Sequence, residues 1–431
     1  MSQYLVTGGI PISGTIKASG NKNAALPCIA AAVLTDDKVT LRNVPDIEDV
    51  QVMLDVYRSF GGLVEPLSRN DYRLSLANIK TSSVPPDAAK KIRASILFAG
   101  PLLARTGKAV LPPPGGDVIG RRRLDTHFLA LTELGAVVNT RNSFLFSAKH
   151  LTGADIFLDE ASVTATENAV MAAALAKGKT ILTNAASEPH VQDLCHMLSS
   201  MGAVIEGIGS NRLTITGVKK LSGCDYTIGA DYMEVGSFIG LAAATRGELI
   251  IEGTSPGDLR PAKTAFGKLG ITWEHEGTTL RVPKKQAMKV NHDLGGMIPK
   301  IDDAPWPGFP PDLTSIVIVV ATQVAGTVLI HEKMFESRMF FVDKLIGMGA
   351  RIVLCDPHRA VISGPAKLAG SELTSPDVRA GMAMVIAAMA AEGSSVIRNV
   401  YQIERGYENL VERLSSLGGK IVRSMDGDGG K

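Results

Sequence analysis

The hydrophobic pattern of this chain repeats one order of elements six times. Each copy has a run of small apolar residues that predicts a buried helix, then a turn and a short apolar strand, then an amphipathic helix followed by another apolar strand. The first helices of the six copies are predicted at residues 24–34, at 93–103, and from near Thr166, Glu234, Leu313 and Arg379.

A glycine closes the second helix of every copy. These glycines are spaced by 67 to 79 residues, and they are Gly61, Gly135, Gly202, Gly270, Gly349 and Gly418. A glycine at this place can adopt the left-handed conformation that ends a helix. The spacing therefore predicts six copies of one unit.

The period of the repeat favours globular domains over a stacked array. Solenoid repeats are usually about 20–50 residues long, which is shorter than this period. We therefore expect two domains of three units each, residues 22–229 and residues 1–21 with 230–431. The strand expected at residues 3–7 could complete the last unit of the second domain.

The two helices of each unit differ in their expected burial. The first is rich in alanine and apolar nearly all round, which predicts a buried helix. The second carries charged residues on one side that should face solvent, namely Arg58, Glu133, Lys268 or Arg413.

Composition excludes several function classes. The chain has 431 residues with 45 Lys and Arg against 43 Asp and Glu, so no overall charge attracts nucleic acid or an anionic membrane. Four scattered cysteines, Cys28, Cys195, Cys224 and Cys355, predict reduced, core-filling thiols and no zinc site. The N-terminus has no signal-peptide pattern and the apolar run 313–330 is interrupted by polar residues, so we expect a cytoplasmic protein that does not span a membrane.

The composition of the segment 112–127 predicts a functional loop. Three prolines and three glycines surround Asp117 and the triple arginine 121–123, between a strand at 108–111 and a helix from Asp125. Such residues favour a surface excursion, and loops of this kind commonly carry function. A solvated basic turn is the alternative.

Charged residues stand where the buried helices should begin. Lys22, Arg93 and Arg379 occupy such starts, and cations make poor caps there because the helix end is already positive. Buried charges persist when a partner or a ligand compensates them. We therefore expect these residues to bind a multiply charged anion, with Arg122 and Arg405 adding to the set.

Asp312 follows the stiff segment 305–311 and precedes another of these helices. A carboxylate fixed near several cations is a candidate general base. It is equally a candidate N-cap of the following helix, and the sequence leaves both open.

Eight segments together resemble the enolpyruvyl transferases, and among them the UDP-N-acetylglucosamine 1-carboxyvinyltransferase family. The resemblance covers nearly the whole chain. The segments are residues 19–27, 43–46, 93–95, 114–122, 307–312, 335–338, 377–381 and 405–408. It implies an α/β fold of two inside-out α/β barrel domains, with six βαβαββ-type units, three per domain.

The same resemblance implies the chemistry. The enolpyruvyl group of phosphoenolpyruvate would pass to the 3-hydroxyl of UDP-N-acetylglucosamine with release of phosphate, the first committed step of peptidoglycan precursor synthesis, and no metal or cofactor is required. Asp117, Asp312 and Lys22 would be catalytic, with Asp312 taking the hydroxyl proton.

Binding residues carry over by position as well. Phosphoenolpyruvate would be held by Lys22, Arg122, Arg338, Arg379 and Arg405. The nucleotide sugar would be held by Asn23, Arg93, Arg122, Arg123, Leu124, Asp125, Ser162, Val163, Thr164, Asp312 and Met334.

The chain departs from the family pattern at four places. Asp117 replaces the usual loop cysteine, and a carboxylic acid can still donate a proton. Thr164 stands where glycine is usual, Pro311 where threonine is usual and Tyr232 where arginine is usual. These three departures concern the acceptor more than the enolpyruvyl chemistry.

Two other functions remain open from the sequence. An enolpyruvyl transferase could act on a different acceptor, either another nucleotide or shikimate-3-phosphate. A catalytically silent repeat protein could bind nucleotide sugars or partner proteins, although such a scaffold has no reason to keep charges at buried helix ends. The sequence does not predict the oligomeric state.

Overall fold

The computed structural model describes residues 2–116, 120 and 123–425. The chain divides into two compact domains. Among the described residues, the first comprises Ser19–Gly116 and 123–229, and the second comprises 2–18, Gly120 and 230–425. In the described part of the chain no helix is both long and apolar enough to cross a bilayer.

The described residues form six separate sheets, three in each domain. In five of them an opening strand pairs in parallel with the next strand, which is followed in the sheet by two antiparallel strands. In the first domain the sheets are β13 (Asp225–Thr227), β3 (Val39–Arg42), β5 (Tyr72–Ser75) and β4 (Leu63–Pro66); β6 (Lys108–Leu111), β8 (Phe144–Ser147) and β7 (Val137–Asn139); and β9 (Asp155–Phe157), β10 (Lys179–Thr183), β12 (Arg212–Thr216) and β11 (Val204–Glu206). In the sheet of β6, β8 and β7 a single parallel bridge, Ser83 to Val110, stands in place of the opening strand.

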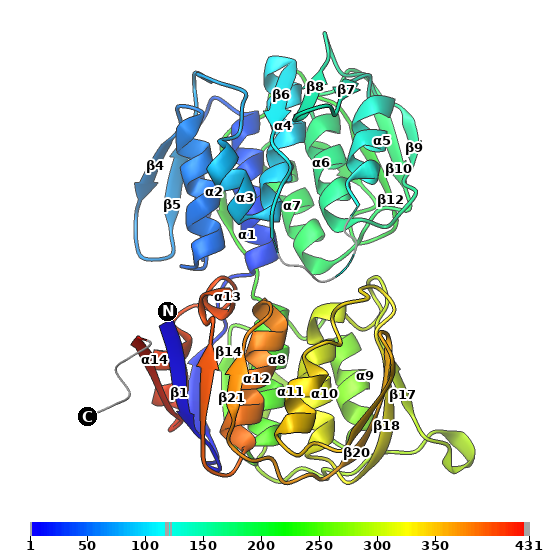
Figure 1. The fold of residues 1–431 in the computed structure, drawn as a ribbon. Helices are drawn as coiled ribbons and strands as arrows, with labels where there is room; N and C mark the ends of the chain where they lie inside the picture. Colours follow the sequence, from blue (N-terminus) through cyan, green and yellow to red (C-terminus); the bar gives the residue numbers. More distant parts are fainter. Residues whose placement is uncertain (1, 117–119, 121–122, 426–431) are drawn as a thin grey trace. The chain divides into compact units, whose positions relative to one another are not determined.

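The second domain repeats this plan (Figure 1). Its sheets are β2 (Ser13–Lys17), β14 (Glu248–Glu252), β16 (Thr279–Val282) and β15 (Glu274–Glu276); β17 (Lys300–Asp302), β18 (Gly326–His331), β20 (Arg359–Gly364) and β19 (Ile352–Asp356); and β21 (Glu372–Thr374), β22 (Ser394–Arg398), β1 (Ser2–Thr7) and β23 (Lys420–Met425).

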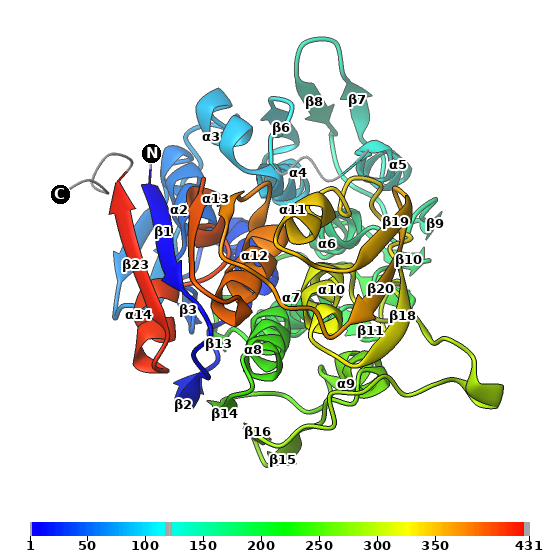
Figure 2. The ribbon, with the colours of Figure 1, turned by 60° about the horizontal axis from the view of Figure 1, so that its bottom comes forward.

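The N-terminal strand β1 completes the last sheet, as its sequence predicted. It lies between β22 and β23 and is antiparallel to both, with Tyr4 opposite Ile397 and Arg423. Figure 2 shows β1 beside β23, with the two strands running in opposite directions. Two opening strands are also supplied from distant parts of the chain: β13 opens the sheet of β3, and β2 opens the sheet of β14.

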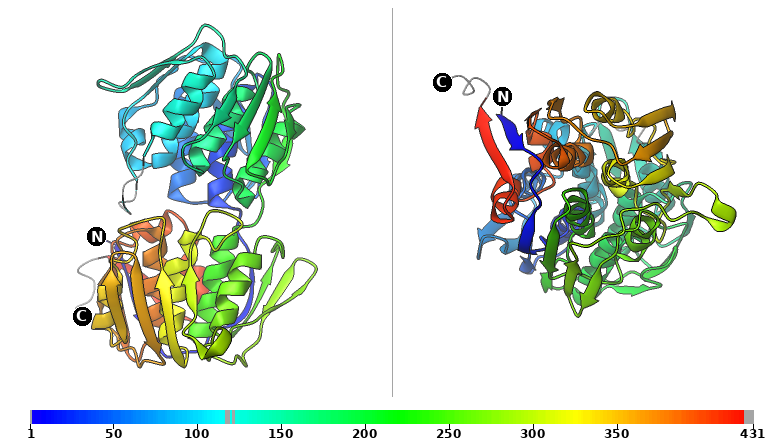
Figure 3. Two further views of the ribbon diagram at one scale, coloured as in Figure 1. Left: turned by 90° about the vertical axis from the view of Figure 1, so that its right-hand side faces the viewer. Right: turned by 90° about the horizontal axis from the view of Figure 1, so that it is seen from below.

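The first helix of every repeat is buried, and the sheets lie outside these helices (Figure 3). The first helices are α1 (Lys22–Ala31) with η1 (Ala32–Leu34), η2 (Arg93–Phe98) with α4 (Ala99–Thr106), α6 (Val163–Ala173), α8 (Tyr232–Ala244), α10 (Thr314–Thr322) and α12 (Val378–Ala390). In the second domain α8, α10 and α12 contact one another, and every residue of α8 and α10 is buried. Gly240 permits this approach, because a Cβ there would meet the Ile316 side chain at 2.5 Å.

The second helices are amphipathic and lie nearer the surface. They are α2 (Glu48–Ser59), α5 (Asp125–Glu133), α7 (Pro189–Ser200), α9 (Arg260–Lys268), α11 (Val342–Gly347) and α14 (Leu410–Ser416), with the short helices α3 (Pro86–Lys91), α13 (Tyr401–Glu404), η3 (Leu294–Gly296) and η4 (Pro311–Leu313) between elements. All six closing glycines have φ between 70° and 103°, which confirms the predicted left-handed helix ends. This inside-out α/β arrangement was predicted, although the sheets stay separate and none of the described strands closes a barrel.

Two sequence predictions are wrong in detail. Arg413 does not face solvent: its Nη1 lies 2.7 Å from Glu234 Oε2 and its guanidinium lies over the Phe238 ring. Glu234 is buried in α8 and therefore needs a counter-charge. Of the four cysteines, all free thiols, Cys28 and Cys195 are buried as expected, whereas Cys355 is exposed on β19.

Tyr4 tests the structural role of β1. It is 1% exposed and its hydroxyl donates to Glu404 Oε1 at 3.1 Å. Tyr4→Ala should lower the free energy of unfolding of the second domain by about 3–5 kcal/mol, and Tyr4→Phe by about 1 kcal/mol. Urea denaturation measures both, with the neighbouring, exposed Leu5→Ala as the control. A Tyr4→Ala protein as stable as the Leu5 variant would contradict a central place for β1.

Candidate active site

Asp312 lies in η4, directly ahead of the buried helix α10. Its two carboxylate oxygens accept hydrogen bonds from different arginines, Oδ1 from Arg338 Nη2 at 2.9 Å and Oδ2 from Arg379 Nε at 3.0 Å. The N-cap position of α10 belongs to Leu313, with no side-chain cap. The alternative of Asp312 as a plain N-cap is therefore wrong, and the carboxylate is fixed between two cations.

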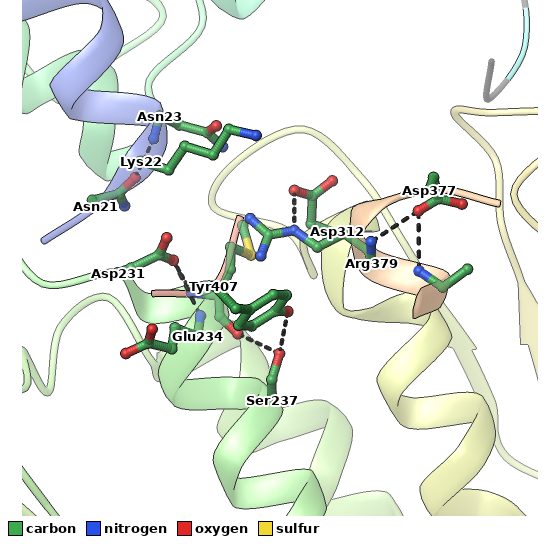
Figure 4. Close-up of polar contacts among 12 residues, drawn as sticks. Asn21, Lys22, Asn23, Asp231, Glu234, Ser237, Asp312, Asp377, Arg379 and Tyr407 are labelled. Atoms are coloured by element: carbon green, nitrogen blue, oxygen red, sulfur yellow. Dashed lines mark hydrogen bonds and ion pairs between the residues drawn. The ribbon is translucent and has the colours of Figure 1, made fainter. Parts of the chain in front are cut away.

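Arg379 is placed by the start of helix α12 (Figure 4). Asp377 caps this helix, since its Oδ1 accepts from the backbone nitrogens of Arg379 at 2.8 Å and Ala380 at 3.0 Å. The Arg379 side chain is buried, its guanidinium lies over the Tyr407 ring, and its Nη1 has no hydrogen-bond partner within the described chain. A buried guanidinium nitrogen without a partner is suited to an anionic ligand.

Arg405 and Tyr407 follow the short helix α13. The Tyr407 hydroxyl lies 2.9 Å from Ser237 Oγ in α8 (Figure 4), and Arg405 Nη1 donates to Gln402 Oε1 at 2.8 Å. Both Tyr407 and Arg405 are buried. The contact with Ser237 fixes the Tyr407 ring over which Arg379 lies, and the contact with Gln402 fixes the Arg405 side chain.

The arginines of this cluster stay charged. Burial by itself lowers the pKa of Arg379, but Tyr407 and Asp312 act against it and hold the pKa well above its usual value. The pKa of Arg338 is likewise raised by Asp312 and Glu332 against the effect of burial. The second domain thus holds permanent cations at the buried start of α12 and beside Asp312.

In the first domain, Lys22 is the first residue of α1 and is 9% exposed. Its Nζ lies 2.5 Å from Oδ2 of the buried Asp49 in α2, and Asn21 caps the helix by accepting from the backbone nitrogens of Asn23 and Ala24. The ammonium group is therefore held at a defined place beside a helix start. Asp49 escaped the sequence analysis because it reads as an ordinary acid in the first turn of a helix.

The residues expected to bind the nucleotide sugar form a polar network at the start of α5. Arg93 Nη2 donates to the backbone oxygen of Arg123 at 3.0 Å, and Arg123 Nε donates to Asp125 Oδ2 at 2.8 Å. Asp159 accepts from Arg123 at 3.3 Å and from Thr126 Oγ1 at 2.7 Å. The structure thereby brings together residues that are 30 or more positions apart.

His127 links this network to the start of α6. Its Nδ1 accepts from Asn168 Nδ2 at 3.0 Å, so its Nε2 carries the proton toward Thr164 Oγ1, also at 3.0 Å. Burial, with a smaller effect of Arg93, lowers the pKa of His127 to about 3, so the ring is neutral. Thr164, one of the departures from the family pattern, therefore turns its hydroxyl to His127.

The remaining expected site residues are placed as follows. Ser162 caps α6 by accepting from the backbone nitrogen of Ala165 at 3.5 Å, and Val163 is the first residue of that helix. Leu124 precedes α5, and Met334 is 37% exposed on the turn after β18. Asp117 and Arg122 lie outside the described residues. Among the residues that the structure describes, no three His, Cys, Asp or Glu side chains gather as a metal-binding group.

Comparisons with known proteins show the family of this chain. The family profile described as EPSP synthase (3-phosphoshikimate 1-carboxyvinyltransferase) matches residues 6–414. The chain is 73% identical over 421 residues to the UDP-N-acetylglucosamine 1-carboxyvinyltransferase of Treponema denticola and 67% identical over 421 residues to that of Treponema pallidum. Each alignment covers 98% of this chain and 99% of the relative.

Solved structures share the fold at lower identity. The enolpyruvyl transferase NikO from Streptomyces tendae superposes with a TM-score of 0.87 at 23% identity, covering 98% of this chain and 99% of that one. EPSP synthase from Acinetobacter baumannii gives 0.77 at 18% identity, covering 99% and 100%. Because the relatives match over almost their entire length, the chain belongs to the EPSP synthase family of 1-carboxyvinyltransferases and, within it, to the UDP-N-acetylglucosamine 1-carboxyvinyltransferases.

Proposed function

We propose that this enzyme transfers the enolpyruvyl group of phosphoenolpyruvate to the 3-hydroxyl of UDP-N-acetylglucosamine and releases phosphate, which begins peptidoglycan precursor synthesis. The observation that carries the proposal is Asp312 fixed between Arg338 and Arg379, with a buried Arg379 nitrogen left for a ligand. The names of the relatives support the choice of acceptor.

Phosphoenolpyruvate is a small anion with a phosphate and a carboxylate, and both groups suit arginine because a guanidinium donates two parallel hydrogen bonds. We assign the carboxylate to Arg379 and Arg405, with Arg338 nearby. We assign the phosphate to Lys22 and Arg122. Lys22 is pre-positioned for this by its ion pair with Asp49.

Asp312 is the general base in this proposal. It takes the proton from the 3-hydroxyl as that oxygen bonds to the central carbon of phosphoenolpyruvate, while a proton is added to the methylene carbon. The resulting tetrahedral ketal then breaks its bond to the phosphate oxygen, a proton leaves the methyl carbon, and the double bond returns. Asp117 is the candidate acid in the protonation step.

The nucleotide sugar is assigned to the network around α5 and the first turn of α6. Arg93, Arg123 and Asp125 are already joined by hydrogen bonds, and the backbone of Ser162, Val163 and Thr164 stands at a helix start whose free N–H groups favour a diphosphate. Asn23, Leu124 and Met334 complete the proposed contacts.

Asp312→Asn should lower kcat by about 100-fold or more, because the amide cannot accept the hydroxyl proton. Binding of UDP-N-acetylglucosamine should change little, since the amide keeps the shape of the carboxylate. Phosphate release measures the first effect and calorimetry the second. Glu372→Gln, an exposed carboxylate of the same domain, is the control. Turnover near the wild-type rate would remove Asp312 from the mechanism.

Arg379→Lys should raise the KM for phosphoenolpyruvate by roughly 10- to 100-fold. A lysine cannot reproduce the paired donors of the guanidinium, and a hydrogen bond to a charged group contributes about 1.5–3 kcal/mol. The dissociation constant of UDP-N-acetylglucosamine should stay within about twofold. Steady-state kinetics tests this against Arg398→Lys, which alters an exposed arginine. An unchanged KM would mean that Arg379 does not hold the anion.

Asp117 predicts resistance to fosfomycin, an epoxide that inactivates family members by reaction with their loop cysteine. A carboxylate is a much weaker nucleophile toward that ring than a thiolate, so the covalent step should fail. Asp117→Cys should restore it and keep catalysis. Intact-protein mass spectrometry after incubation with fosfomycin and UDP-N-acetylglucosamine measures the adduct. An adduct on the wild type, or none on the cysteine variant, contradicts the assignment of Asp117.

A further inference from the structure

Two buried carboxyl groups lie behind the Arg338 to Asp312 ion pair. Asp303 directly follows β17 and Glu332 directly follows β18. These strands are parallel, with Asp302 paired to His331, so the two carboxyl-bearing residues leave the sheet side by side. Asp303 is 1% exposed and Glu332 is fully buried.

Together the two carboxyl groups hold the turn that follows β18. Asp303 Oδ1 accepts from the backbone nitrogen of Lys333 at 2.5 Å, and Oδ2 accepts from that of Met334 at 3.3 Å. Glu332 Oε1 accepts from the backbone nitrogen of Phe335 at 3.2 Å. Three consecutive N–H groups are thus satisfied by buried side chains, and the chain that leaves this turn carries Arg338.

The second oxygen of Glu332 faces Arg338 without bonding to it. Glu332 Oε2 lies 3.9 Å from Arg338 Nε, too far for a hydrogen bond, and neither atom has another partner among the described residues. The same guanidinium donates through Nη2 to Asp312 at 2.9 Å. Arg338 therefore stands between two carboxyl groups but is bonded to only one.

Protonation explains this asymmetry. Burial raises the pKa of Glu332 to about 8; Arg338 opposes the shift, and the charge of the adjoining Asp303 carboxyl adds to it. His358 also contacts this residue, but through Nδ1 and the Glu332 backbone oxygen at 2.7 Å. At neutral pH Glu332 is therefore uncharged, and Arg338 has a single ionised partner in Asp312.

We infer that Glu332, supported by Asp303, is a positioning residue that in its neutral form holds the 333–335 turn and leaves Arg338 to Asp312 and the substrate anion. The inference rests on the proposed function for its substrate. Loss of the Glu332 proton would create a second anion beside Arg338 Nε and draw the guanidinium away from Asp312. Glu332 itself touches no reacting atom in this scheme.

The matched variant is Glu332→Gln, because the amide imitates the protonated carboxyl: its oxygen accepts from the Phe335 nitrogen, and it places no negative charge beside Arg338. We expect kcat/KM for phosphoenolpyruvate to be similar in the two proteins at pH 6.5. The kcat/KM of the wild type divided by that of the variant should then fall about tenfold by pH 9, since one ionisation with a pKa of about 8 affects only the wild type. Taking the ratio cancels every other titration that the two proteins share.

Asp302→Asn is the control, because this neighbouring carboxylate pairs with Lys300 and Lys333 away from the buried pair. The kcat/KM of the wild type divided by that of Asp302→Asn should not change with pH. A Glu332→Gln ratio that is constant with pH, or a folded but inactive Glu332→Gln protein, would overturn the inference.

Two further measurements of kcat/KM against pH test the inference if the Glu332→Gln protein does not fold. Asp303→Asn removes the neighbouring negative charge, so the alkaline fall in kcat/KM should move to lower pH, and an unmoved fall counts against the inference. A wild-type profile that stays flat to pH 9 overturns it without any variant. Failure of the proposed function is a different result: wild-type enzyme that forms no product from phosphoenolpyruvate and UDP-N-acetylglucosamine at pH 7.

Discussion

The ion pairs of Asp312 with Arg338 and Arg379 are the interaction on which the buried arginines of the second domain depend. Helices α8, α10 and α12 are almost wholly apolar and contact one another, so a charged group buried beside them is not hydrated by water. A buried guanidinium is tolerated only with partners, and removing one partner from a buried pair is typically several kcal/mol unfavourable. Asp312 and Tyr407 supply those partners for the Arg379 guanidinium, Asp377 accepts from its backbone nitrogen, and one guanidinium nitrogen stays available.

The repeat explains why the chemistry gathers at helix starts in both domains. Each unit buries most of its first helix, and polar residues lie in the first turn of these helices, as with Asn23 in α1 and Thr164 in α6. The free N–H groups and the positive dipole end lie at the same turn. One architecture, used six times, thereby offers several equivalent places for anion-binding residues.

Two carboxyl groups on either side of Arg338 illustrate how environment separates their roles. Asp312 accepts a hydrogen bond from each of two arginines, which stabilises its ionised form, whereas Glu332 is fully buried beside Asp303 and its pKa is raised to about 8. Arg338 can therefore lie close to both carboxyl groups and form an ion pair with Asp312 alone. In the first domain, burial similarly keeps His127 neutral so that it can donate to Thr164.

The sequence alone determined the features that depend on local periodicity. Six units, the left-handed closing glycines and the buried first helices follow from the spacing of apolar residues and glycines, because helix and strand periods are a property of neighbouring residues. The sequence suggested that β1 could complete the last sheet, and its pairing with strands at the other end of the chain is a tertiary contact. The charges of Lys22, Arg93 and Arg379 were also conspicuous, because they contradict the apolar pattern around them.

Only the tertiary structure decided which groups those charges meet. Asp312 bonds to arginines 26 and 67 positions away, and Arg413 reaches Glu234 across 179 positions. Asp49, Asp303 and Glu332 read in the sequence as ordinary acids, since nothing local distinguishes a buried carboxyl from an exposed one. Their burial and their partners exist only once distant strands and helices pack, and the protonation of Glu332 follows from that packing.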